Sequence, residues 1–130
     1  MDDDRVIETI ADGLRLQAGP LSADDAPRVL RGATAAYVIG FALGVSRAMD
    51  VPVGNHTVRL LERGCRQGLP KDGDLGQRLA DIATRLLLLN RLDDPSLHEH
   101  KERGESEGRA FVEDNAPPSG LRSLLAVEAS

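Results

Sequence analysis

The sequence has almost no aromatic residues and a single cysteine. Among 130 residues there are two phenylalanines, one tyrosine and no tryptophan. A core must therefore be built from Leu, Ile, Val and Ala, which suits helices, because the aromatic and β-branched residues that favour sheet are sparse. With no second cysteine, Cys65 cannot form an internal disulfide, and a thiolate zinc site would lack its other ligands.

An excess of positive charge is also absent. The chain has 16 Lys and Arg against 21 Asp and Glu, a formal net charge of −5. Nucleic-acid binding depends on clustered positive charge, and an acidic protein is repelled by anionic membranes, so we expect neither as a partner. The first residues, MDDDRVIETI, lack the basic and apolar regions of a secretory signal, which favours a cytoplasmic protein.

Apolar residues spaced three and four apart predict a series of helices. We expect helices over residues 3–17, 24–49, 56–67, 75–89 and 95–114. The sequence therefore predicts an all-α fold, a compact bundle of four to five helices over residues 1–115 with a buried central helix at about 24–49. Two prolines in the following segment predict a linker and a short C-terminal amphipathic tail over residues 116–130.

The two helices expected over 75–89 and 95–114 differ in composition. Five apolar residues of the first alternate four and three apart, which predicts the strongest bundle face: Leu75, Leu79, Ile82, Leu86 and Leu89. In the second, HEHKERGESEGR at residues 98–109 has no large apolar side chain, so we expect its middle to be solvated, mobile or covered by a partner. Asp74 and Asp94 are the expected N-caps of these two helices.

The stretch GATAAYVIGFALGV, residues 32–45, contains no charge. As a helix it would span about 21 Å, short of the roughly 30 Å of a bilayer core, which favours a buried central helix over a membrane span. Small residues recur within and just beyond it at every fourth position, at Gly32, Ala36, Gly40, Gly44 and Ala48. We call this row the small-residue ridge.

Glycine inside a helix costs about 0.5–1 kcal/mol relative to alanine, and close approach of another helix would offset that loss along the small-residue ridge. The crossing helix belongs either to the same chain or to a second copy in a homodimer. The ridge and the tail leucines are therefore the expected interface residues. The tail leucines are Leu121, Leu124 and Leu125.

His98, His100 and Glu102 form a weak candidate metal site. On a helix, residues two apart point about 200° away from each other, so the two histidines would not share an ion. His98 and Glu102 would share a face, but a zinc site needs three or four ligands.

No set of residues in the sequence resembles an assembled catalytic centre, and we expect no cofactor. The favoured hypothesis is a small helical module that binds another protein, as an adaptor, regulator, inhibitor or immunity-type factor, or dedicated chaperone. The alternative is a bundle enzyme, or a small-molecule or metal binder, that uses His56, His98 or His100.

Overall fold

A computed structural model describes residues 3–18, 21, 23–89 and 91–127, and the regular secondary structure of this part of the chain is helical, without strands. Its α-helices are α1 (Asp3–Ala18), α2 (Ala26–Val29), α3 (Gly32–Ala48), α4 (Asn55–Gly68), α5 (Leu75–Leu88), α6 (Pro95–Glu113) and α7 (Gly120–Val127). Three single 3-10 turns join them: η1 (Ala23–Asp25), η2 (Asp72–Asp74) and η3 (Arg91–Asp93). The all-α prediction is confirmed, but seven helices exceed the four to five expected.

The predicted central helix at 24–49 is two helices. The segment Ala23–Val29 and α3 meet at an angle of 82°. Between them Leu30 leaves the helical region (φ −89°, ψ 64°) and Arg31 is extended (φ −125°, ψ 157°). Burial is as predicted for α3, in which every residue from 34 to 42 is buried, but the single continuous helix is wrong.

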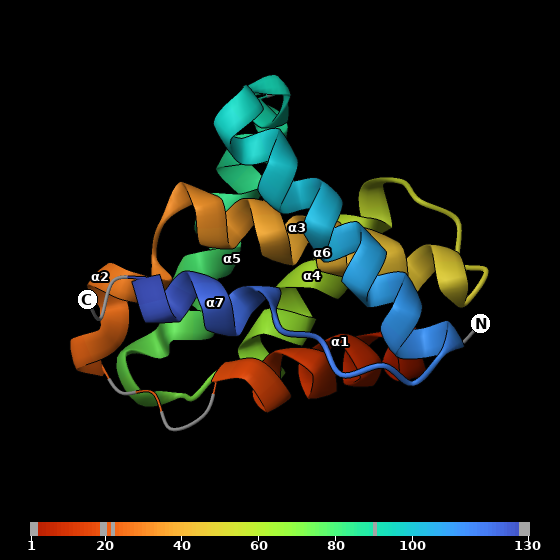
Figure 1. Ribbon diagram of the computed structural model, residues 1–130, viewed down its shortest axis with the longest axis horizontal. Coiled ribbons are helices and arrows are strands. Elements are labelled where there is room, and N and C mark those ends of the chain that lie inside the picture. The colour runs from red at the N-terminus through yellow and green to blue at the C-terminus, as the bar shows by residue number, and fades with distance from the viewer. Residues whose placement is uncertain (1–2, 19–20, 22, 90, 128–130) are drawn as a thin grey trace.

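Helix α3 lies at the centre of the molecule (Figure 1). Helices α6 and α7 cover it in front, α4 and α5 lie behind it, and α1 runs below. The core side chains are almost all aliphatic, as the composition predicted, with Tyr37 and Phe41 from α3 as the largest.

The small-residue ridge of α3 packs against α6 of the same chain. A Cβ atom added to Gly40 would lie 1.9 Å from the carbonyl oxygen of Lys101, and one added to Gly44 would lie 2.2 Å from that of Glu105. These neighbours are backbone atoms, which cannot turn aside as a side chain can. The sequence left open whether the crossing helix belongs to the same chain or to a second copy, and in the structure it is α6 of the same chain.

Helix α6 contributes glycines to the same crossing. A Cβ on Gly104 would lie 2.1 Å from the carbonyl oxygen of Tyr37, and one on Gly108 would lie 2.5 Å from that of Phe41. Both glycines are buried, so the middle of α6 is solvated on one face only, with Glu102, Arg103, Ser106 and Arg109 exposed. At the two glycines the contact is made by backbone rather than by large side chains.

The second half of α5 and the first half of α6 extend away from the body as a helical hairpin closed by η3 (Figure 1, top). The predicted leucine seam of α5 is therefore buried only near its start. Leu75 and Leu79 are fully buried, Leu86 is half-buried, and Leu89 is 64 % exposed. The seam ends where α5 leaves the body of the molecule.

The two predicted N-caps have different outcomes. Asp94 accepts a hydrogen bond from the backbone N–H of Ser96 at 2.9 Å, with Pro95 in the first turn, as predicted. Asp74 precedes α5 in the left-handed region (φ 54°, ψ 38°), and its side chain makes no capping hydrogen bond. The capping prediction for Asp74 is wrong, because this backbone geometry does not aim its carboxylate at the helix amides.

Candidate functional site

The small-residue ridge is not available to a partner. Ala36, Gly40 and Gly44 are buried under α6, while Gly32 and Ala48 at the two ends are partly exposed. The close crossing thus serves the fold of the single chain.

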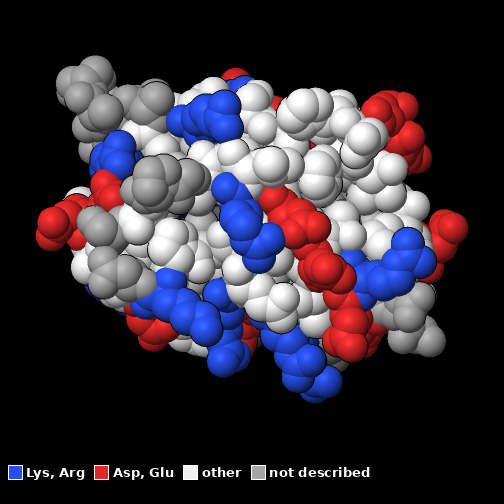
Figure 2. All heavy atoms as spheres, turned by 90° about the horizontal axis from the view of Figure 1, so that it is seen from below, with Lys and Arg blue, Asp and Glu red and all other residues white. Residues whose placement is uncertain are grey.

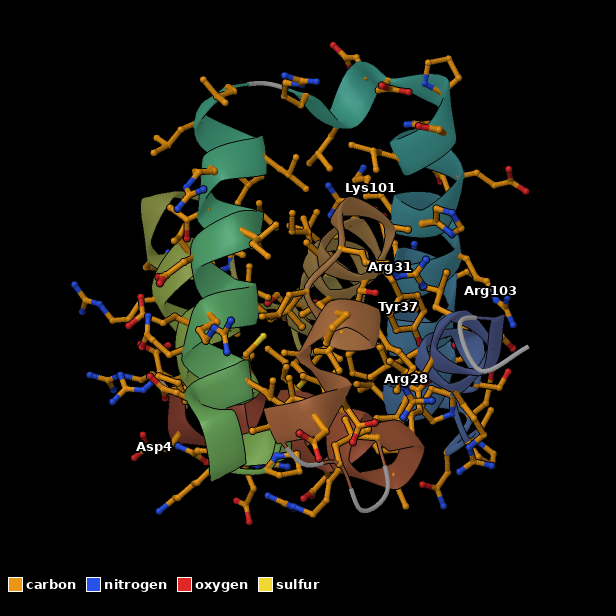
Figure 3. All side chains as sticks on the ribbon, turned by 90° about the vertical axis from the view of Figure 1, so that its left-hand side faces the viewer. Asp4, Arg28, Arg31, Tyr37, Lys101 and Arg103 are labelled. Carbon is orange, nitrogen blue, oxygen red and sulfur yellow. The ribbon has the colours of Figure 1, made fainter. Side chains whose placement is uncertain are left out.

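The tail leucines also lie against the body of the molecule. Leu121 is 1 % exposed and Leu125 is 6 % exposed, whereas Leu124 is half-buried. Arg31 donates to the carbonyl oxygen of Leu124 at 2.8 Å, and Arg28 to that of Leu125 at 3.4 Å. Figure 3 shows both arginines on the side of the α2–α3 segment that faces α7.

A buried polar group that sequence patterns did not reveal holds the start of α7. The Glu107 carboxylate accepts hydrogen bonds from the Tyr37 hydroxyl at 2.6 Å, from the Gly120 N–H at 2.8 Å and from the Ser119 N–H at 3.0 Å. Gln17 accepts a further one from the Leu121 N–H at 2.7 Å. These contacts join α1, α3, α6 and α7, so the group supports the fold.

Burial and hydrogen bonding act in opposite directions on the pKa of Glu107. Burial raises it, but the hydrogen bonds from Tyr37, Gly120 and Ser119 together outweigh burial and lower it. For Tyr37, burial and the neighbouring Glu107 carboxylate both raise the pKa of the hydroxyl. Tyr37 therefore remains a proton donor to an ionised Glu107 at neutral pH.

The histidines and the cysteine do not assemble into a reactive centre. His98 and Glu102 lie 3.2 Å apart as an exposed pair one helical turn apart. No group of three or more His, Cys, Asp or Glu that could hold a metal ion occurs among the described residues. Cys65 is fully buried, and burial followed by the nearby Glu62 raises the pKa of its thiol to about 12. Cys65 is thus a small apolar core residue.

Large exposed apolar side chains gather at the end of α5. Leu88 is 79 % exposed and Leu89 is 64 % exposed, and three half-buried leucines adjoin them in sequence. We call Leu86, Leu87, Leu88, Leu89 and Leu92 the leucine tip. Single exposed leucines are common on soluble proteins, but a cluster at the end of a projecting hairpin is a candidate contact surface.

The sequence predicted Leu86 and Leu89 as part of the bundle face of α5. The spacing of the leucines does not show where along α5 this face is no longer covered. From residue 84 to residue 103 the structure has no fully buried residue among those that it describes. Helix α5 passes beyond the helices that could cover it.

On the face shown in Figure 2, basic and acidic side chains are interspersed, so this face has no large surface of a single charge.

Within the described residues no single helix is long and apolar enough to cross a membrane. The bent pair formed by Ala23–Val29 and α3 is the one combination of these helices that meets the length and composition requirement.

Comparisons with protein-family models, curated proteins and solved structures found no match to this chain.

Proposed function

We propose that the chain is a protein-interaction module that binds an apolar groove of another protein through the leucine tip. The observation that carries this proposal is the exposure of Leu88 and Leu89 at the end of a projecting helical hairpin. The proposal keeps the interaction role expected from sequence and moves the contact surface from the small-residue ridge and the tail to this hairpin.

Burial of the leucine tip would supply part of the free energy of binding. Full burial of a leucine side chain contributes about 1.5–3 kcal/mol, so covering Leu88 and Leu89 would contribute at most about 3–6 kcal/mol before the costs of association. The half-buried members of the tip add further apolar area. Apolar side chains of a helix that enter a groove of the partner are a recurring mode of protein recognition.

The shape of the hairpin supports a partner with a concave site. A projecting pair of helices presents its end and two sides, and α5 and α6 are held at their other ends by buried residues such as Leu79 and Gly104. The tip is therefore carried on helices anchored in the core, which limits the conformational entropy lost on binding.

The test is affinity capture from a native extract with three forms of the full chain. The forms are the wild type, the tip variant Leu88→Ser/Leu89→Ser, and the matched control Leu16→Ser/Val53→Ser. The control also removes two exposed apolar side chains, which are 54 % and 46 % exposed and lie elsewhere on the surface. We expect a specific protein to be retained by the wild type and the control and lost from the tip variant.

Retention of the same protein by all three forms, or loss from both variants, would contradict a role for the tip. Sedimentation velocity on the same forms tests whether the partner is a second copy of the chain. A concentration-dependent dimer that disappears in the tip variant would identify the partner as the chain itself.

A further inference from the structure

A cleft with a volume of about 650 Å³ lies between the end of α4 and the start of α5, at the other end of α5 from the leucine tip. Its lining includes Arg63, Arg66, Gln67, Lys71, Asp74 and Gln77. Ligand sites in proteins have volumes of about 300–1,000 Å³, so this cleft is large enough for a small organic molecule.

The charge of the cleft is opposite to that of the chain. Among the lining residues that the structure describes, three are basic (Arg63, Arg66 and Lys71) and one, Asp74, is acidic, in a protein of net charge −5. Arg66 makes a long, exposed ion pair of 3.4 Å with Glu62. Arg63 and Lys71 have no ion pair with any residue that the structure describes.

Close packing between α4 and α5 places the start of α5 beside the arginines of α4. A Cβ on Gly76 would lie 2.4 Å from the carbonyl oxygen of Cys65 and 2.8 Å from the Cα of Arg66. The glycine thus lets the first turn of α5 lie against the backbone of α4, beside the two arginines. Gln67 and Gln77 place amide groups on the same cleft, and these can donate hydrogen bonds.

Cations that face one concavity repel each other, and an anion bound between them would reduce that repulsion. Guanidinium groups present paired N–H donors that match the oxygens of phosphate, and an ammonium group adds a point charge.

We propose that this cleft binds a small phosphorylated anion, recognised by Arg63, Arg66 and Lys71 through its phosphate group. The cleft is larger than one phosphate group, so the anion is either an organic phosphate ester or inorganic pyrophosphate. Both kinds of anion present phosphate oxygens to the cleft, and a comparison of their affinities distinguishes them.

The experiment titrates the full chain with inorganic pyrophosphate and with ribose 5-phosphate at constant ionic strength, followed by amide chemical shifts in NMR spectra. We expect saturable binding, with the largest shifts at Gly76, Gln77 and neighbouring amides of α4. Tighter binding of ribose 5-phosphate would identify the organic ester as the source, and tighter binding of pyrophosphate the inorganic anion.

The variant Arg63→Gln/Lys71→Gln should weaken binding of the preferred anion by about tenfold or more, because it removes two charge-assisted contacts. The matched control Arg85→Gln/Arg91→Gln removes the same charge from exposed positions near the leucine tip, and it should leave the affinity within about twofold. Shifts that do not saturate below about 10 mM, or an equal loss in the two variants, would show only non-specific attraction and overturn the proposal. Both variants keep every residue of the leucine tip. A failure to bind the anion can therefore be told apart from a failure to capture a protein partner.

Discussion

The α3–α6 crossing and the leucine tip show opposite relations between hydrophobicity and burial. At the crossing, the buried positions of α6 are Gly104 and Gly108, within one of the most polar stretches of the chain. At the tip, Leu88 and Leu89 are mostly exposed. In these two segments burial follows from how closely a second helix can approach, and the apolar character of the segment does not predict it.

The physical difference lies in which atoms make the contact. At the crossing, backbone meets backbone, and the distance of 1.9 Å from a hypothetical Cβ on Gly40 to the Lys101 oxygen shows that no side chain fits between them. Dispersion contacts of two closely apposed backbones replace those of large side chains. At the tip, Leu86, Leu87 and Leu92 are partly buried against the core, whereas the large side chains of Leu88 and Leu89 remain mostly uncovered.

The largest expected effect concerns the tail, which the sequence predicted to be a separable segment. Truncation after Asn115 would remove Leu121 and Leu125 from the core and leave Gln17 and Glu107 without their backbone donors. We expect a loss of about 4 kcal/mol or more in the free energy of unfolding, measured by urea denaturation. A truncated chain as stable as the full one would show that burial in α7 contributes little, and the tail would be separable as the sequence predicted.

The second effect tests the crossing directly. Gly40→Ala places a methyl group against the Lys101 carbonyl and should destabilise the chain by about 2 kcal/mol or more, although alanine is the better helix former by about 1 kcal/mol. Gly32→Ala is the matched control on the same ridge, because its Cβ would meet only a side-chain atom of Leu97 at 3.4 Å. The control should be neutral or stabilising, and equal effects of the two changes would refute a backbone contact at Gly40.

Sequence patterns predicted the fold class and most helix boundaries because periodicity and turn residues are local signals. They predicted the small-residue ridge and its need for a close neighbour, but not the neighbour. A signal was present, since Gly104 and Gly108 have the same four-residue spacing as Gly40 and Gly44. Charged residues around it give the middle of α6 the composition of a solvated helix.

The remaining features depend on distant parts of the chain. Tyr37 and Glu107 meet across 70 positions of sequence, and no local pattern pairs them. The exposure of Leu88 depends on where the covering helices end, which the periodicity of α5 does not contain. The break between α2 and α3 comes from the backbone at Leu30 and Arg31. Gly32 follows directly, but the four-residue spacing of small residues assigned it to the interior of a continuous helix.

The third effect concerns the polar group beneath α7 and depends on pH. The pKa of Glu107 in the folded chain is lowered, so its ionised form stabilises the fold above the unfolded pKa, near 4.5. That contribution is lost as the pH falls from there through the lower folded value. Glu107→Gln should cost about 1 kcal/mol at pH 7, since a neutral acceptor replaces a charged one.

The stability difference between wild type and Glu107→Gln should therefore shrink in urea titrations below about pH 4.5. Glu113→Gln is the control, because Glu113 is about half exposed and lies 4.0 Å from Arg109 in a surface pair. A difference from wild type that stays constant with pH would mean that the charge of Glu107 does not stabilise α7.

The smallest expected effect is at the leucine tip, which the opening comparison set against the α3–α6 crossing. Leu88→Ala removes most of a side chain that is 79 % exposed, so the free energy of unfolding should change by less than about 0.5 kcal/mol. Leu79→Ala is the same change nine residues earlier in the same helix, at a fully buried position, and should cost about 2–5 kcal/mol. Both are measured by urea denaturation at a chain concentration low enough to keep the protein monomeric. A cost at Leu88 that approaches the cost at Leu79 would mean that the tip packs within the monomer, and its leucines would then have no free surface to offer a partner.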